Sequence, residues 1–198
     1  MTDTEFEDSK QLWLMFEAKE AFKAVHQGCL ELVRSGLGED SPLYFPLIAG
    51  LICLYGKPFK ANRGVGKLPI EMVPKELLDL HNDLILIRDK LYVHSDATIT
   101  ETVAKRHVGF GELRSYRWPD DAGYYIQRLQ IGPEFFSKFM AVLADRMREK
   151  TNDYVDKLGR KLAPHVPNRP GEFLLNIKDK EGPLFTEVEP LRPRKGST

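Results

Sequence analysis

Residues 74–94 read PKELLDLHNDLILIRDKLYVH, and this stretch decides the fold class of the chain. Pro74 is typical of the first turn of a helix, and the apolar residues after it recur at helical spacing. The apolar face of the predicted helix consists of Leu77, Leu78, Leu84, Ile85, Leu91 and Tyr92. His81, Arg88 and Tyr92 follow one another at spacings of seven and four residues, so they line one side of the same helix.

The segments on both sides of this stretch also carry helical patterns. Apolar residues recur every three to four positions in residues 5–34 and again from Gly132-Pro133 to about residue 162. Residues 43–54 are apolar nearly all round, which is typical of a buried central helix. The chain is therefore predicted to be mainly α, a helical bundle of four or so helices spanning residues 1–162.

Two segments interrupt the helical pattern with strand signals. Residues 114–118 and 124–131 are rich in aromatic and β-branched side chains and flank the turn sequence 119–123, which predicts a β-hairpin inserted within residues 97–131. Residues 163–198 form a proline-rich C-terminal extension. Within it, residues 172–177 and 184–188 could form a small second hairpin, and the final residues are expected to be disordered.

Composition narrows the classes of function. The 198 residues suit one domain, and the 29 basic residues are balanced by 29 acidic ones, so a non-specific nucleic-acid coat is disfavoured and RNA contact needs a local basic patch. Cys29 and Cys53 lie in apolar helical patterns, which indicates reduced, buried thiols rather than a disulfide framework or a zinc site. The acidic N-terminus and the lack of a long apolar run predict a cytoplasmic protein without a membrane partner.

The end of the 74–94 stretch carries the motif with the most chemical content. Arg88 is followed by the polar Asp89, and five residues separate Arg88 from His94. This arrangement resembles the HEPN domain family, whose motif is an arginine, usually followed by a polar residue, with four to six residues before a histidine. The resemblance implies an α-helical bundle, and often a dimeric, metal-independent ribonuclease related to toxins or phage defence. Other HEPN-like members are non-catalytic.

The motif residues suit RNA cleavage by the RNA's own 2′-hydroxyl. His94 titrates near neutral pH and can act as base or acid, while Arg88 stays charged and can hold the phosphate. Asp89 could orient either residue, and Tyr92 could hydrogen-bond the phosphate. Arg88 and His94 lie about 120° apart around an ideal helix, so they converge only if the helix ends near Val93 or a second subunit completes the site.

Further substrate-binding candidates are His81 and the basic residues Lys57, Lys60 and Arg63 of the loop 57–67, which has four basic residues and no acid. Each has a plainer interpretation. His81 lies on the apolar side of its helix, where a core or dimer-interface role is the alternative. The loop is equally interpretable as a solvated connector whose glycines serve turn geometry.

Two main hypotheses follow. The first is a HEPN-like, metal-independent endoribonuclease that acts as a homodimer on RNA and is controlled by a protein antitoxin or regulator, with no metal or cofactor. The second is a non-catalytic HEPN-like module that binds RNA, nucleotide or a protein partner, with its motif held in internal salt bridges. A purely structural role on a helical scaffold is a third possibility, because a fold alone does not define a function.

Overall fold

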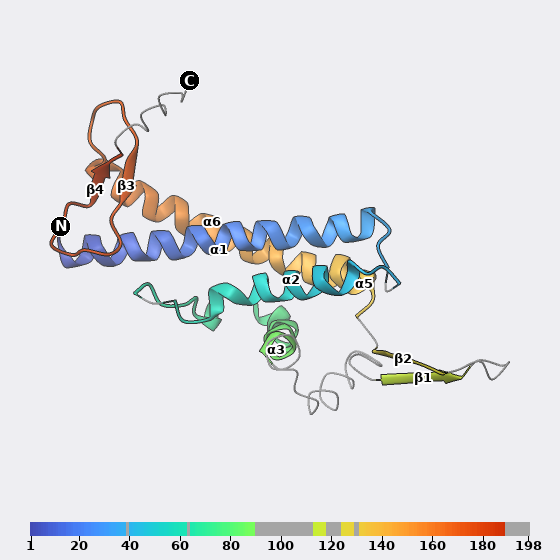
Figure 1. Ribbon diagram of the computed structural model, residues 1–198. Coiled ribbons are helices and arrows are strands. Elements are labelled where there is room, and N and C mark those ends of the chain that lie inside the picture. Colours follow the sequence, from blue (N-terminus) through green and yellow to red (C-terminus); the bar gives the residue numbers. More distant parts are fainter. Residues whose placement is uncertain (39, 63, 90–112, 118–123, 129–130, 189–198) are drawn as a thin grey trace, which may run out of the picture.

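The computed structural model describes residues 1–38, 40–62, 64–89, 113–117, 124–128 and 131–188, and this part of the chain is mainly helical (Figure 1). Its α-helices are α1 (Asp3–Arg34), α2 (Tyr44–Gly56), α3 (Leu78–Ile87), α5 (Pro133–Phe135) and α6 (Ala141–Leu162). The π-helical segment η6 (Phe136–Met140) joins α5 to α6, so residues 133–162 form one long helix. The mainly α fold class is confirmed, including the long first and last helices.

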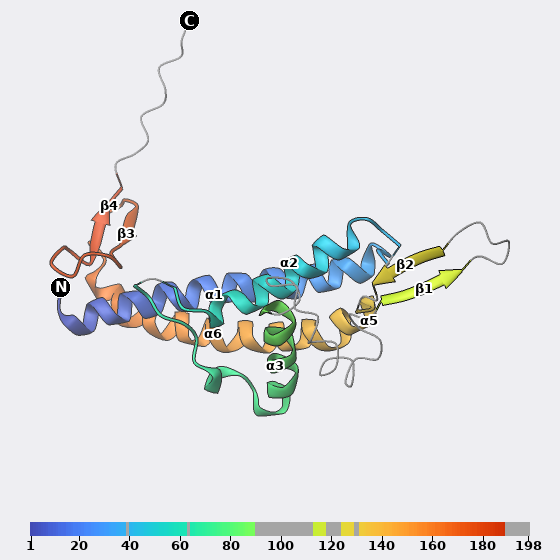
Figure 2. The ribbon, with the colours of Figure 1, turned by 60° about the horizontal axis from the view of Figure 1, so that its bottom comes forward.

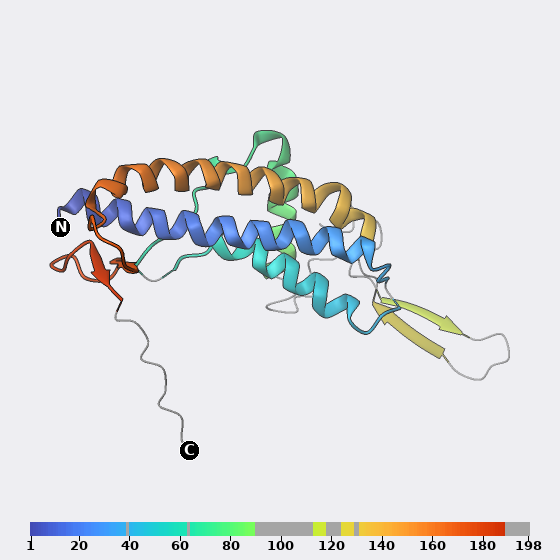
Figure 3. The same cartoon turned by 90° about the horizontal axis from the view of Figure 1, so that it is seen from above.

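Two long helices, α1 and α6, run antiparallel beside each other, and α2 lies on the opposite side of α1 from α6 (Figure 3). The side chains of α1 that face the hydrophobic core are fully or almost fully buried, and four of them have no exposed surface: Phe22, Val25, Cys29 and Leu32. Phe136, Met140 and Leu143 fill the facing side. Burial of each large apolar side chain contributes about 1.5–3 kcal/mol, so this seam is a main source of stability.

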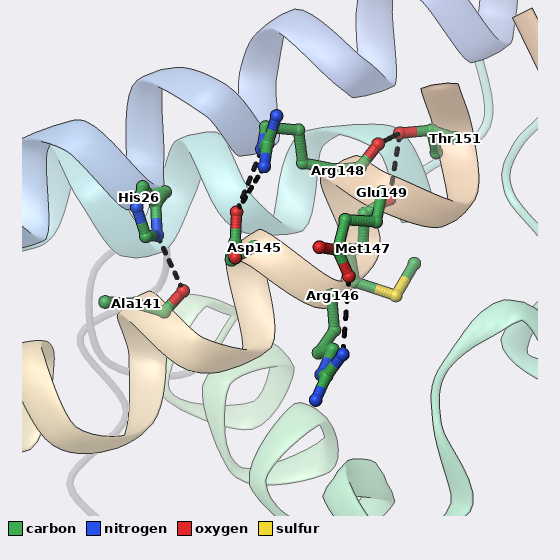
Figure 4. A network of polar contacts seen from close by, with 8 residues as sticks. All are labelled: His26, Ala141, Asp145, Arg146, Met147, Arg148, Glu149 and Thr151. Carbon is green, nitrogen blue, oxygen red and sulfur yellow. Dashed lines mark hydrogen bonds and ion pairs between the residues drawn. The ribbon is translucent and has the colours of Figure 1, made fainter. Parts of the chain in front are cut away.

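Polar contacts join α1 to α6 and brace α6 itself (Figure 4). The ring Nδ1 of His26 hydrogen-bonds the carbonyl oxygen of Ala141, the first residue of α6, at 3.0 Å. One turn on, the guanidinium of Arg148 donates twice to Oδ1 of Asp145, at 2.9 and 2.7 Å. The buried hydroxyl of Thr151 donates to a carbonyl oxygen of the preceding turn at 2.8 Å, so its burial leaves no donor unpaired.

Helix α3 runs across the long helices and packs against α2 (Figure 2). Leu84 and Ile87 anchor it, because both are fully buried. The predicted start at Pro74 is displaced: residues 75–77 form the 3₁₀ turn η3 (Lys75–Leu77), and α3 begins at Leu78. No side chain caps the N-terminus of η3 or α3, which leaves the first turn tightened rather than α-helical.

The connector between α2 and α3 starts with the 3₁₀ turn η1 (Lys57–Phe59), contains η2 (Ile70–Met72), and folds back on itself between them. Asn62 N–H donates to the carbonyl of Gly66 at 2.9 Å, and Gly66 N–H donates back to Asn62 at 3.1 Å. Gly64 and Gly66 have φ angles of 83° and 86°, which only glycine adopts readily. The expectation that these glycines serve turn geometry is confirmed.

Two antiparallel hairpins complete the described chain. Strands β1 (Leu113–Arg117) and β2 (Tyr124–Arg128) pair with Leu113 opposite Arg128, and the hairpin leads into α5 (Figure 1). Strands β3 (Phe173–Leu175) and β4 (Phe185–Glu187) follow the 3₁₀ turn η7 (Ala163–His165) and lie beside the N-terminus. Both predicted hairpins are therefore present. In the C-terminal hairpin each strand has three residues, fewer than the sequence pattern indicated.

The C-terminal hairpin is attached to α1 by specific contacts. The buried hydroxyl of Ser9 lies 2.8 Å from the carbonyl oxygen of Asn176, and Lys180 forms an ion pair with Asp3 at 2.9 Å. The extension thus packs on the first helix. Residues 191–198, predicted to be disordered, lie outside the described part of the chain. None of the described helices combines the length and apolar character needed to cross a membrane.

Candidate functional site

Arg88 follows α3 directly and lies against the end of α2. Its backbone N–H donates to carbonyl oxygens of the last turn of α3, so the residue still has helical geometry. A Cβ atom on Gly56 would lie 2.3 Å from Cδ of Arg88 and 3.0 Å from its Nε. Only the absence of a side chain at Gly56 therefore lets the Arg88 stem pass this closely over α2.

Asp89 joins two cations at this point. Nη1 of Arg88 donates to Oδ1 of Asp89 at 2.6 Å, and Nζ of Lys60 donates to Oδ2 at 2.5 Å. Burial raises the pKa of the Asp89 carboxyl, but the Lys60 hydrogen bond and the charges of Lys60 and Arg88 outweigh it, so the pKa lies below its usual range. The carboxylate is ionised at neutral pH, and the three-residue cluster carries one net positive charge.

The ion pair with Asp89 does not satisfy every N–H group of the Arg88 guanidinium. Its buried Nε has no hydrogen-bond partner within the described residues. The side chain is 20% exposed and that of Asp89 is 31% exposed, so solvent or a ligand can reach the pair. A partly exposed arginine beside a lysine suits an oxyanion such as phosphate.

Cys53 lies close enough to sense both charges. Burial raises the pKa of its thiol, the Arg88 charge lowers it in part, and the Asp89 charge raises it again. The thiol is therefore protonated at neutral pH and is a poor nucleophile. Sequence reasoning did not assign Cys53 or Gly56 to the site, and the only available signal was a glycine ending an otherwise apolar segment.

His81 is separate from this cluster and belongs to the core. Only 3% of it is exposed, Nδ1 lies 2.8 Å from the hydroxyl oxygen of Tyr55, and the ring meets Phe59 edge-on at a centroid distance of 4.4 Å. Burial lowers the pKa of His81 to about 4 and raises that of Tyr55, so both are neutral at physiological pH. This placement matches the core interpretation rather than the substrate-binding one, because no substrate can reach the ring.

The basic residues of the connector that were predicted to bind substrate do not share one site. Lys60 joins Asp89, whereas Lys57 turns to α1 and forms an ion pair with Glu17 at 3.3 Å. Arg63, Tyr92 and His94 lie outside the described residues. The structure thus brings together Arg88, Asp89 and Lys60 of the predicted site.

Within the described residues, no three His, Cys, Asp or Glu side chains are grouped to hold a metal ion. The chemistry available to the described cluster is therefore charge-assisted binding of an anion by Arg88 and Lys60, with Asp89 fixing both cations. Comparison of the chain with protein-family models, with curated proteins and with solved structures gave no match.

Proposed function

We propose that this chain is a HEPN-like endoribonuclease that cleaves RNA without a metal ion, in the manner of toxins and phage-defence effectors. One observation carries the proposal: Arg88 and Lys60 converge on a single carboxylate, so the cluster around the arginine of the motif keeps one net positive charge. That charge suits the phosphate of an RNA strand, whose oxygens gain negative charge in the transition state.

The proposed reaction uses residues of this chain alone. Arg88 and Lys60 hold the scissile phosphate, and Asp89 keeps the guanidinium in place. His94 takes the proton of the adjacent 2′-hydroxyl, whose oxygen attacks phosphorus. The bond from phosphorus to the 5′-oxygen breaks, the protonated His94 gives its proton to the leaving 5′-oxygen, and a 2′,3′-cyclic phosphate forms.

A homodimer is part of the proposal. Several large apolar side chains on α1, η6 and α6 are 40–53% exposed: Leu30, Val33, Phe139 and Val142. Exposed apolar surface of this kind supports association of two copies. A dimer would allow the arginine of one copy and the histidine of the other to share a site, and a protein antitoxin or regulator would act by covering it.

The test is cleavage of a mixed RNA pool in EDTA by the purified protein and by Arg88→Ala, His94→Ala and Lys60→Gln variants. We expect the first two substitutions to abolish cleavage and the third to slow it about ten-fold or more, since removal of one charge-stabilising donor costs roughly 10²–10³ in rate at the strongest sites. Arg148→Ala is the matched control, because Arg148 also pairs with a nearby aspartate, on α6. Circular dichroism and thermal melts verify folding. Cleavage that survives both Arg88→Ala and His94→Ala would overturn the proposal.

A second candidate is a non-catalytic RNA-binding module, and the internal Arg88–Asp89 ion pair favours it. Asp89→Asn separates the two candidates. In a ribonuclease this substitution loosens Arg88 and lowers the cleavage rate. In a binding module it removes a carboxylate that competes with phosphate, so RNA affinity rises and no product forms in the wild type or the variant.

A further inference from the structure

A second cleft lies away from the Arg88 cluster, between the N-terminal half of α1, the connector and the C-terminal hairpin. Its volume is about 700 Å³, within the range of pockets that bind small organic ligands. Three segments that are distant in sequence form its walls, through Trp13 of α1, Asn62 of the connector and Lys178 of the hairpin. A cleft that exists only when these segments pack together has no signature in the sequence.

The α1 wall combines aromatic rings with a cation. Phe6, Lys10 and Trp13 follow at spacings of four and three residues, so they share one face of the helix. Nζ of Lys10 lies 4.9 Å from the ring centroid of Phe6 and 2.7 Å from Oε1 of Glu7. The Glu7 side chain is 62% exposed and the Lys10 side chain 19%, so solvent screens the carboxylate and weakens this ion pair.

The opposite wall presents Lys178 on an ordered turn. Oδ1 of Asn176 accepts from the backbone N–H of Lys178 at 3.1 Å, and its Nδ2 donates to the carbonyl of Pro183 at 2.9 Å. The carbonyl of the same asparagine meets the buried hydroxyl of Ser9 on α1 at 2.8 Å. The backbone of Lys178 is thereby held at the wall of the cleft, and its exposed side chain has no ion-pair partner within the described residues.

Charge in this cleft is segregated. The chain as a whole has equal numbers of acidic and basic residues, yet the described residues that line the cleft include two lysines and no acidic residue. Glu7, which pairs with Lys10, is not among them. Aromatic faces beside lysines form the usual surface for single-stranded nucleic acid, because bases stack on the rings while phosphates meet the cations. An apolar peptide would leave the two lysines unpaired, and a free phosphate would leave the rings unused.

We propose that this cleft binds single-stranded RNA, with a base stacked on Trp13 and phosphates held by Lys10 and Lys178. The choice of RNA rests on the ribonuclease function proposed above, whereas the cleft's preference for a single strand does not. Trp13 also lines a small hollow with Lys57 and Asn62, and Lys60 of the same connector reaches Asp89. The connector thus contributes residues both to the cleft and to the Arg88 cluster.

The test uses a short 2′-O-methyl oligoribonucleotide, which cannot be cleaved through its 2′-oxygen, and the same strand annealed to its complement. The chain has two tryptophans, so Trp118→Phe leaves Trp13 as the sole fluorescent reporter. We expect quenching of Trp13 emission by the single strand and weaker binding of the duplex. Trp13→Ala should weaken single-strand binding on the order of ten-fold or more, as loss of one stacking platform does. Lys178→Gln should reduce the slope of log affinity against log salt by about 0.7.

The matched controls are Phe16→Ala and Lys138→Gln. Phe16 is 47% exposed on the same helix as Trp13 and does not line the cleft, and Lys138 lies on η6. Both should bind the single strand like the wild type. Wild-type affinity of folded Trp13→Ala and Lys178→Gln, equal binding of duplex and single strand, or no binding at low salt would overturn the inference. If Trp13→Ala fails to fold, the Lys178→Gln salt slope decides alone.

The two proposals fail separately. Binding that depends on Trp13, in a protein that does not cleave RNA in EDTA, would keep the cleft and remove the ribonuclease. Cleavage abolished by Arg88→Ala, with an unchanged KM in Trp13→Ala and Lys178→Gln, would keep the ribonuclease and remove the cleft.

Discussion

Replacement of Gly56 by alanine tests whether Arg88 is held against α2 as described. The new Cβ would lie 2.3 Å from Cδ of Arg88, while ordinary contact begins at 3.4 Å, so the arginine stem must move by about 1 Å. That movement withdraws the guanidinium from its position beside Asp89. Gly56 itself has ordinary helical φ, so backbone strain does not contribute.

The expected magnitude follows from two opposing effects. Alanine in place of a helical glycine stabilises by roughly 0.5–1 kcal/mol, whereas overpacking of a filled contact costs roughly 1–3 kcal/mol. Gly56→Ala should therefore lower the free energy of unfolding by up to about 2 kcal/mol. In an Arg88→Ala background the obstructing side chain is absent, and the same substitution should stabilise by roughly 0.5–1 kcal/mol.

Urea unfolding of the wild type, both single variants and the double variant measures the coupling, which should be about 1–3 kcal/mol. Gly50→Ala is the control in the same helix, because a Cβ there meets no atom within 4 Å. It should stabilise equally in both backgrounds. Additivity of Gly56→Ala and Arg88→Ala within about 0.5 kcal/mol would refute the contact. If Arg88 holds the scissile phosphate, Gly56→Ala should also slow RNA cleavage by up to about 10²-fold, the effect of a 1 Å displacement.

Two further predictions concern stability. In the folded protein the pKa of His81 is about 4, below its ordinary value of 6.5, because burial disfavours the charged ring. The contribution of the neutral His81 to the free energy of unfolding is therefore fully present above pH 6.5. It should decrease as the pH falls towards 4, by up to about 3 kcal/mol. His81→Asn should remove most of this dependence in urea titrations at pH 4.5 and 7.5, and an unchanged pH slope would contradict the assignment. Thr2 caps α1 through a reciprocal capping box with Glu5. Thr2→Ala should therefore lower the free energy of unfolding by about 1 kcal/mol, measured by thermal melts. A change of less than about 0.3 kcal/mol would show that the cap does not stabilise the helix.

Local periodicity was enough to place the main elements. The helices at residues 3–34 and 133–162 carry apolar side chains at a spacing that only a helix can gather on one face, so their prediction needed no knowledge of partners. The first hairpin was found for a similar reason, since segments rich in aromatic and β-branched residues flank a short turn sequence. The strand ends of the C-terminal hairpin differ from the predicted ones by one or two residues, because hydrogen-bond pairing rather than composition determines where a strand stops.

For the candidate site, too, the residues of the motif were predictable and their tertiary partners were not. Arg88 and Asp89 were identifiable as a motif, but their partners were not: Lys60 and Gly56 lie about thirty residues earlier, on elements whose packing no local pattern describes. For His81, likewise, the sequence did not show what surrounds the ring. A histidine on an apolar helix face can point to solvent, to a partner or into the core, and only the packing of Tyr55 and Phe59 over its ring decides among these.

Local sequence patterns were sufficient for the helical class, for the approximate positions of the helices and hairpins, and for the charged residues near the motif, because these depend on neighbours within one or two turns. Which of these charges meet depends on tertiary packing. Lys57 and Lys60, three residues apart, reach different helices, and Trp13 and Lys178 form one cleft although most of the chain separates them. The physical reason is that salt bridges and clefts depend on distances of a few ångströms between elements. Those distances are set by the packing of the whole core rather than by any single segment.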